Sequence, residues 1–198
     1  MNLPSFRSFL RSVCAAVALA VATQAGAYDI PAFHKAPFDR DGIFLEESER
    51  QSLLEALAAI SSNFGGISTI DEDVVEKSLG LALAIDPFHG NSRKAHEALS
   101  AGEKPNPTNF YDSRSAAAEA LWGIASELAS PPVEPEAGRL APLVMEIALL
   151  VHPSTDADRI LEFASLSEGI DEAWAGFVDL QPAINNSNLR ARSFRREA

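Results

Sequence analysis

The sequence predicts an all-α fold, a solenoid-like helical-repeat stack of about six to seven helices built from two three-helix units. Two blocks that recur in the same order support this prediction. Residues 55–64 (EALAAISSNF) are matched 64 positions later by residues 119–128 (EALWGIASEL), and residues 82–87 (ALAIDP) are matched 66 positions later by residues 148–153 (ALLVHP). Such self-similarity is typical of stacked helices whose usual product is a binding surface.

Residues 1–27 have the composition of a signal peptide. Arg7 and Arg11 give a positive start, residues 13–21 are mostly apolar, and residues 25–27 (AGA) form a small-x-small cleavage site. The apolar run is short for a membrane span. We therefore expect export to a periplasmic or secreted location with no stable membrane insertion after cleavage; a retained N-terminal anchor is the alternative.

The mature chain is acidic and lacks cysteine, because Cys14 lies within the signal segment. Neither a disulfide nor a thiolate metal site is therefore expected. Removing Arg7 and Arg11 leaves 14 basic against 28 acidic residues, a net charge of −14. Such a chain repels polyanions, so its electrostatics disfavour nucleic-acid binding, and basic partners or cations fit better.

The first unit is predicted over residues 45–102, after an extended lead-in at 28–44. Its first helix, residues 45–62, has apolar residues at helical spacing. About 170 residues remain after the signal segment, which is enough for one ordinary domain. We therefore expect residues 45–182 to form a single helical-repeat domain.

Capping and stop signals set the other helices of this unit. Thr69 and Glu72 form a capping box that starts the second helix, and Pro87 stops it. Asn91 or Ser92 is expected to cap a third, shorter helix. The acidic residues near Glu72 are explained by the helix dipole, and calcium binding is the alternative, although the ligand spacing of a calcium loop is missing.

The second unit, residues 112–168, repeats this order. Asp112 is expected to cap a helix that runs to residue 128, and further helices are predicted over 138–152 and 156–166. Residues corresponding to core positions of the first unit remain apolar. A capping helix over 170–181 would cover the open end of the stack, as a solenoid requires.

Residues 183–198 form a basic tail with four arginines and one glutamate: Arg190, Arg192, Arg195, Arg196 and Glu197. We expect a flexible, solvated terminus. The alternative is contact with an acidic surface or with another part of the chain.

One stretch resembles a known family. Ala82, Ala84, Ile85, Asp86, Pro87, Ala95, Leu99 and Gly102 match the junction between adjacent tetratricopeptide repeats. The resemblance covers about residues 72–105, with a degenerate copy at 138–168 in which His152 replaces the aspartate; the family's tryptophan, glycine and tyrosine signature positions are not visible. It implies a helical scaffold that binds peptides or proteins in a concave groove.

No motif for catalysis, cofactor binding or metal binding stands out. Nucleophile-elbow, phosphate-loop, dinucleotide and zinc-helix patterns are missing from the sequence. His89 and His96 are seven residues apart, but His89 falls in the turn after Pro87. We interpret both as solvent-exposed histidines rather than as a metal pair.

Phe110, Tyr111 and Trp122 are the candidates for partner binding, because aromatic residues dominate binding hot spots. Trp122 stands where the other unit has Ala58. Its alternative role is packing against the proline-containing loop at 131–135.

Two functions of different class follow. The first is an exported, non-catalytic helical scaffold that binds a protein or peptide partner. The second is a helical accessory region of a larger or truncated envelope enzyme, for example a hydrolase or peptidase. A carboxylate pair acting as general acid and base also stays open, since 28 acidic residues bring some pair together, and cation binding by the acidic surface is a third hypothesis.

Overall fold

The computed structural model describes residues 38–39, 42–43, 45–63, 69–107 and 113–175, all within the compact unit Pro31–Ala198. The predicted signal peptide and basic tail lie outside the described residues. Within the described ranges there are seven helices and no strand. The predicted all-α class is therefore confirmed.

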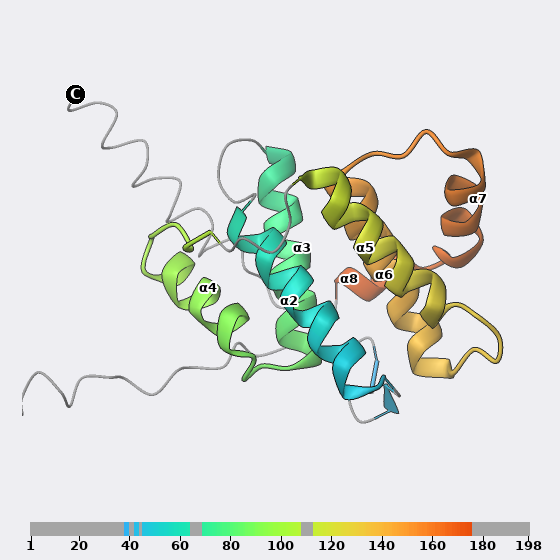
Figure 1. Ribbon diagram of the computed structural model, residues 1–198, viewed down its shortest axis with the longest axis horizontal. Coiled ribbons are helices and arrows are strands. Elements are labelled where there is room, and N and C mark those ends of the chain that lie inside the picture. The colour runs from blue at the N-terminus through green and yellow to red at the C-terminus, as the bar shows by residue number, and fades with distance from the viewer. Residues whose placement is uncertain (1–37, 40–41, 44, 64–68, 108–112, 176–198) are drawn as a thin grey trace, which may run out of the picture. The chain divides into compact units, whose positions relative to one another are not determined.

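In chain order the helices are α2 (Glu47–Asn63), α3 (Thr69–Ile85), α4 (Gly90–Ser100), α5 (Arg114–Leu128), α6 (Pro135–Val151), α7 (Ala157–Leu166) and α8 (Ile170–Trp174) (Figure 1). α3 and α6 both end one residue before an X-Pro pair, Asp86-Pro87 and His152-Pro153. Proline disfavours helical geometry in the residue before it, which accounts for both ends. In the described part of the chain no helix is long and apolar enough to cross a membrane.

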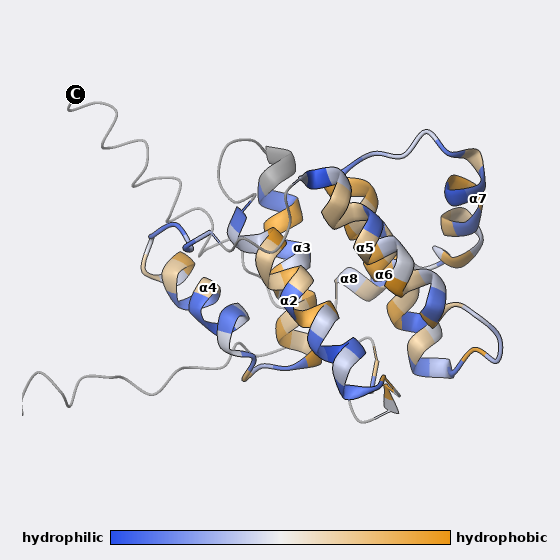
Figure 2. Ribbon diagram, viewed as in Figure 1, coloured by the Kyte–Doolittle hydropathy of each residue, from blue (hydrophilic) through white to orange (hydrophobic). Residues whose placement is uncertain are grey.

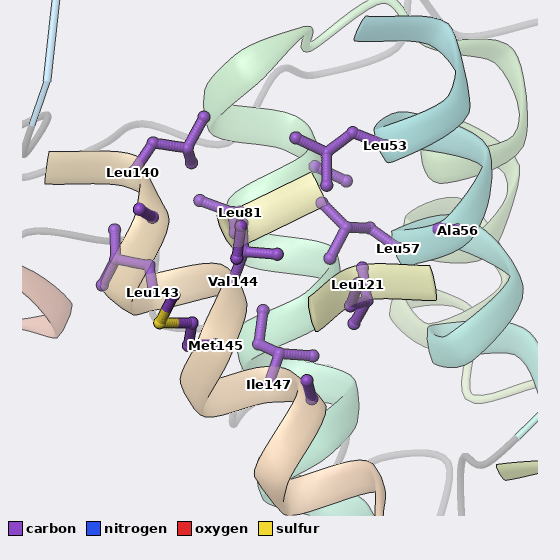
Figure 3. Packing of buried hydrophobic residues seen from close by; sticks show 14 of the residues in the cluster. Leu53, Ala56, Leu57, Leu81, Leu121, Leu140, Leu143, Val144, Met145 and Ile147 are labelled. Atoms are coloured by element: carbon purple, nitrogen blue, oxygen red, sulfur yellow. The ribbon is translucent and has the colours of Figure 1, made fainter. Parts of the chain in front are cut away.

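Four helices share the main hydrophobic core. α2 packs on α3, α3 on α6, α6 on α5, and α5 on α2, so that the contacts close a ring. Buried residues from all four helices belong to one cluster. Figure 3 shows Val144 and Ile147 on the side of α6 that faces labelled residues of the other three helices: Leu53 and Leu57 of α2, Leu81 of α3 and Leu121 of α5. Burial of this apolar surface is the main stabilising contribution.

A second, smaller core holds α4 against α3. Val75, Leu79 and Leu83 of α3 meet Ala95 and Leu99 of α4, and all five are buried. The other side of α4 carries exposed charged residues, and most of this helix has hydrophilic colours in Figure 2. α4 is thus an amphipathic helix with its apolar side covered.

α7 and α8 pack differently. Neither has a fully buried residue, although Phe163, Leu166, Ile170 and Trp174 are partly buried against the main core. Hydrogen bonds attach them: Arg159 donates to Glu119 of α5, and the indole Nε1 of Trp174 donates to Glu146 of α6. The predicted capping helix 170–181 is seen only as far as Trp174, since residues from 176 onward lie outside the described residues.

The end of the lead-in is anchored on the start of α6. Phe38 and Ile43 are buried in the main core, and the backbone N–H of Asp39 donates to Glu136, 2.6 Å away. Gly42 lies against the same side chain, because a Cβ atom there would come within 2.9 Å of the Glu136 Cγ. The glycine therefore permits this close approach.

Three expected helix starts differ from the structure. α5 begins at Arg114, and its cap is Ser113, whose hydroxyl accepts from the N–H of Ala116, rather than Asp112. α6 begins at Pro135, three residues before the expected Gly138. Proline is well tolerated there because the first helical N–H has no partner within the helix.

α4 begins at Gly90, so that Asn91 and Ser92 lie inside the helix instead of capping it. His89 precedes it and is buried, with 7% of its surface exposed, so the expectation of a solvent-exposed residue was wrong. Its ring nitrogens contact the Ser92 hydroxyl (2.7 Å) and the Glu55 carboxylate (3.3 Å). Because Glu55 on α2 and Ser92 on α4 engage both ring nitrogens, this polar side chain can be buried. His96 is only half-buried.

Candidate functional site

A pocket of about 390 Å³ opens at one end of the four-helix core. It lies where α2 begins, α5 ends and α6 begins, and the α5–α6 loop closes one side. We call it the end pocket. Its lining residues are Leu45, Ser48, Glu49, Ser52, Ile124, Glu127, Leu128, Ser130, Pro132, Glu134 and Ala137.

The end pocket combines an apolar interior with a polar, acidic edge. Leu128 and Ala137 are buried, and Leu45 and Ile124 are partly buried. Three glutamates also line it, Glu49, Glu127 and Glu134, and all three are exposed. No lining residue is basic, so the edge is uniformly negative.

Helix stability explains two of these glutamates. Glu49 is in the first turn of α2, and its carboxylate accepts from the backbone N–H of Glu46 at 3.0 Å, as in half of a capping box. Glu134 precedes the first residue of α6. Both carboxylates lie at the positive ends of helix dipoles, which favours them there.

Glu127 has no such explanation. It lies in the last turn of α5, where the helix dipole is negative and a carboxylate is unfavourable. Within the described ranges its carboxylate has no hydrogen-bond or ion-pair partner, and neither does the carboxylate of Glu134. A side chain placed against a local preference, at the edge of a pocket, marks a candidate functional residue.

The hydroxyl groups in the pocket are partly engaged. Ser52 donates to the carbonyl of Ser48 at 2.8 Å, and Ser130 donates to the carbonyl of Ser126 at 2.7 Å. Each hydroxyl oxygen keeps its lone pairs for a ligand N–H. The edge of the end pocket is therefore rich in hydrogen-bond acceptors, and the chemistry that fits it is a cationic donor with an apolar stem.

Trp122, predicted as a partner-binding residue, lies in the main core with 6% of its surface exposed. The guanidinium of Arg159 lies over its ring, 5.4 Å from the centroid, and also binds Glu119. The structure therefore gives Trp122 packing contacts with α7. Phe110 and Tyr111 lie outside the described residues.

Trp174 has a similar arrangement. The Lys77 ammonium lies 5.3 Å from its ring centroid and also pairs with Glu146, which accepts from the indole N–H at 2.5 Å. Each tryptophan thus lies against a cation that pairs with a glutamate on α5 or α6, two helices that contribute to the main core. These contacts attach α7 and α8.

Within the described ranges no group of three or more histidine, cysteine or acidic side chains is placed to hold a metal ion. The carboxylates of Glu49, Glu127 and Glu134 share the end pocket without forming such a group. Sequence reasoning did not find the end pocket, because its residues come from three helix ends far apart in the chain. The one available signal was Glu127, an acidic residue in a last helical turn.

The comparisons with known proteins found no match: no family model, no curated protein and no solved structure is similar to this chain.

Proposed function

We propose that the chain is an exported, non-catalytic helical protein that binds a protein or peptide partner through the end pocket. The observation that carries the proposal is a pair of carboxylates beside an apolar interior, Glu127 and Glu134, which have no hydrogen-bond or ion-pair partner among the described residues. A lysine or arginine side chain of a partner would place its stem against Leu128 and Ile124 and its charged head between these carboxylates.

The size and charge of the site support this proposal. A volume of about 390 Å³ is at the lower end of the range for ligand pockets, and one or two side chains fill such a space. The expected mature charge of −14 attracts a basic partner over longer distances. The signal-like segment at residues 1–27 places the encounter outside the cytoplasm in this proposal.

We also propose that α2–α4 and α5–α7 are two copies of one ancestral unit. A pair of tethers supports this. Glu55 accepts from Asn91 at 2.8 Å, near the start of α4. Glu119, 64 positions after Glu55, accepts from Arg159 at 2.7 Å, near the start of α7. Residues at the same place in both repeats of the sequence thus hold the third helix in each segment.

A peptide-binding measurement tests the proposed function. Fluorescent octapeptide pools with a central arginine between apolar residues are titrated with the protein, and pools with a central glutamate serve as the comparison. We expect the arginine pools to bind with a dissociation constant of about 100 μM or tighter, which corresponds to about 5.5 kcal/mol. Equal binding of both pools would contradict a basic anchor.

Matched variants separate the end pocket from the general charge of the protein. The double variant Glu127→Gln/Glu134→Gln should weaken binding of the arginine pools about tenfold, since it removes two charge-assisted hydrogen bonds. The control is Glu97→Gln/Glu103→Gln, which changes the net charge equally at two exposed sites outside the pocket. If both double variants weaken binding equally, the end pocket is not the site.

A further inference from the structure

α7 presents an apolar stripe to solvent. Ala157, Ile160, Leu161 and Ala164 are all exposed, with 47% of Ile160 and 67% of Leu161 accessible. Their spacing of i, i+3, i+4 and i+7 places them on one side of the helix. We call these four residues the outer stripe. Exposed apolar residues at this spacing form the kind of helix face that binds another chain segment.

The corresponding side of α4 is covered. Three residues of α4 are buried: Ser92, Ala95 and Leu99. The residues 66 positions later in α7 are exposed: Asp158, Leu161 and Ser165. The side that α4 turns to the core is therefore the side that α7 turns to solvent. In α4 the partner of this side is α3; in α7 the partner is still to be supplied.

The tether to α5 sets the rotation of α7. Arg159 makes two hydrogen bonds to Glu119, at 2.7 and 2.6 Å, and lies over Trp122. Residues two apart on a helix point about 200° apart, so a helix that turns Arg159 inward turns Leu161 outward. Phe163 lies on the Arg159 side and is partly buried. The exposure of the stripe thus follows from a specific contact.

The segment of the chain that carries the outer stripe is acidic. Residues 154–175 include six acidic residues: Asp156, Asp158, Glu162, Glu168, Asp171 and Glu172. The single lysine or arginine in this range is Arg159, which is already paired with Glu119. An occupant of the stripe must therefore offer apolar side chains together with positive charge.

We propose that the outer stripe binds the chain's own C-terminal segment, residues 184–196. This segment has both required properties, because Ile184, Leu189 and Phe194 alternate with four arginines, Arg190, Arg192, Arg195 and Arg196. With Glu197 the terminal region still has a net charge of +3. The apolar side chains cover Ile160 and Leu161, and the arginines pair with the surrounding carboxylates.

The chain is long enough for this contact. Thirteen residues separate Ala175 from Leu189, and an extended chain of that length spans up to about 45 Å. The 10 residues of α7 are about 15 Å long, and a domain of this size has a radius of gyration near 14 Å. The short connection also gives an effective concentration in the millimolar range. A second copy is a poorer occupant, since it would bring the same acidic surface.

Disulfide trapping in the full chain tests the proposal. In a Cys14→Ser background no other cysteine is present, so Ser165→Cys and Ser193→Cys introduce one thiol beside the stripe and one in the tail. The comparison is Ser130→Cys with Ser193→Cys, which reports a tail that visits the end pocket instead. We expect the intramolecular disulfide to form at least tenfold faster in the first pair under mild oxidation. The shorter chain separation between the two cysteines of the first pair would by itself make the disulfide form only about threefold faster.

Two further variants of the first pair identify the contact. Leu161→Ser should slow the disulfide at least fivefold, whereas Phe88→Ser, at an equally exposed phenylalanine on the other segment, should leave the rate unchanged. Melting temperatures confirm that both variants fold. Equal rates for the two cysteine pairs, a faster Ser130→Cys pair, no effect of Leu161→Ser, or disulfide-linked dimers would each overturn the proposal. None of these outcomes depends on the peptide pools of the end pocket.

Discussion

The two three-helix segments, α2–α4 and α5–α7, use corresponding residues in opposite ways. α4 buries Ala95 and Leu99 in a small core against α3. In α7 the residue that corresponds to Ala95, Leu161, faces solvent, and the Arg159–Glu119 pair joins the helix to α5 beside the partly buried Phe163 and Leu166. α4 and α7 are thus attached to their neighbours in opposite rotations. The comparison indicates that a long-range polar contact, together with a few apolar contacts, sets which side of a short helix faces solvent.

A pair of leucine variants should give the largest difference. Leu99→Ala removes a buried side chain from the small core and should lower the free energy of unfolding by about 2–4 kcal/mol. Leu161→Ala removes an exposed side chain and should change it by less than about 0.5 kcal/mol. Urea denaturation measures both. Equal losses would mean that α7 is packed as tightly as α4.

The two polar contacts that hold α4 and α7, Glu55 with Asn91 and Glu119 with Arg159, should give the next largest effect on the free energy of unfolding. Glu55→Ala removes the acceptor for Asn91 and the contact of the buried His89, and should cost about 1–2 kcal/mol because polar groups lose their partners. Glu119→Ala should cost less, because its carboxylate is exposed to water. Urea unfolding again provides the measurement. A larger loss for Glu119→Ala would show that the polar tether is the stronger attachment.

Ser78 provides a stabilising variant. Its hydroxyl is buried and, in the described part of the chain, has no hydrogen-bond partner. The residue 66 positions later is Val144, a buried apolar side chain of α6. Ser78→Ala should therefore raise the free energy of unfolding by up to about 1 kcal/mol, since an unsatisfied polar group is removed. A thermal melt checks the sign, and destabilisation would point to an unseen partner of the hydroxyl.

The smallest expected effect is a difference in pH dependence. Burial lowers the pKa of His96 in α4 below its ordinary value of 6.5. Folding therefore favours the neutral ring of His96. The contribution of His96 to the free energy of unfolding is present above pH 6.5 and is lost as the pH falls through the lower pKa of the folded state. Acidification should weaken α4 first. Urea unfolding at pH 7.5 and 5.5 should show a smaller difference for His96→Gln than for the natural chain.

The Arg159–Glu119 pair that holds α7 should lose its contribution to stability at a lower pH than His96 does. The hydrogen bond from Arg159 lowers the pKa of Glu119 below its ordinary value of 4.5. Its contribution is therefore present above pH 4.5 and is lost as the pH falls through the lower, folded pKa. In Glu119→Gln the decline of stability below pH 4.5 should be shallower. An unchanged profile would mean that the pair adds nothing to folding.

The sequence was sufficient for features that depend on neighbouring residues. The all-α class follows from apolar spacing, and the ends of α3 and α6 follow from Pro87 and Pro153. Starts were less certain, because several caps were possible near each one. Ser113 rather than Asp112 caps α5, and Pro135 rather than Gly138 begins α6. A shift of a few residues changes little of the packed helix.

Only the tertiary structure decided the features that join distant residues. The end pocket exists because the starts of α2 and α6 meet the end of α5, and His89 is buried because Glu55 and Ser92 satisfy its ring. The rotation of α7 likewise depends on Glu119, 40 residues away from Arg159. Helical periodicity states which residues share a side, but contacts with residues far away in the chain decide which side faces the core.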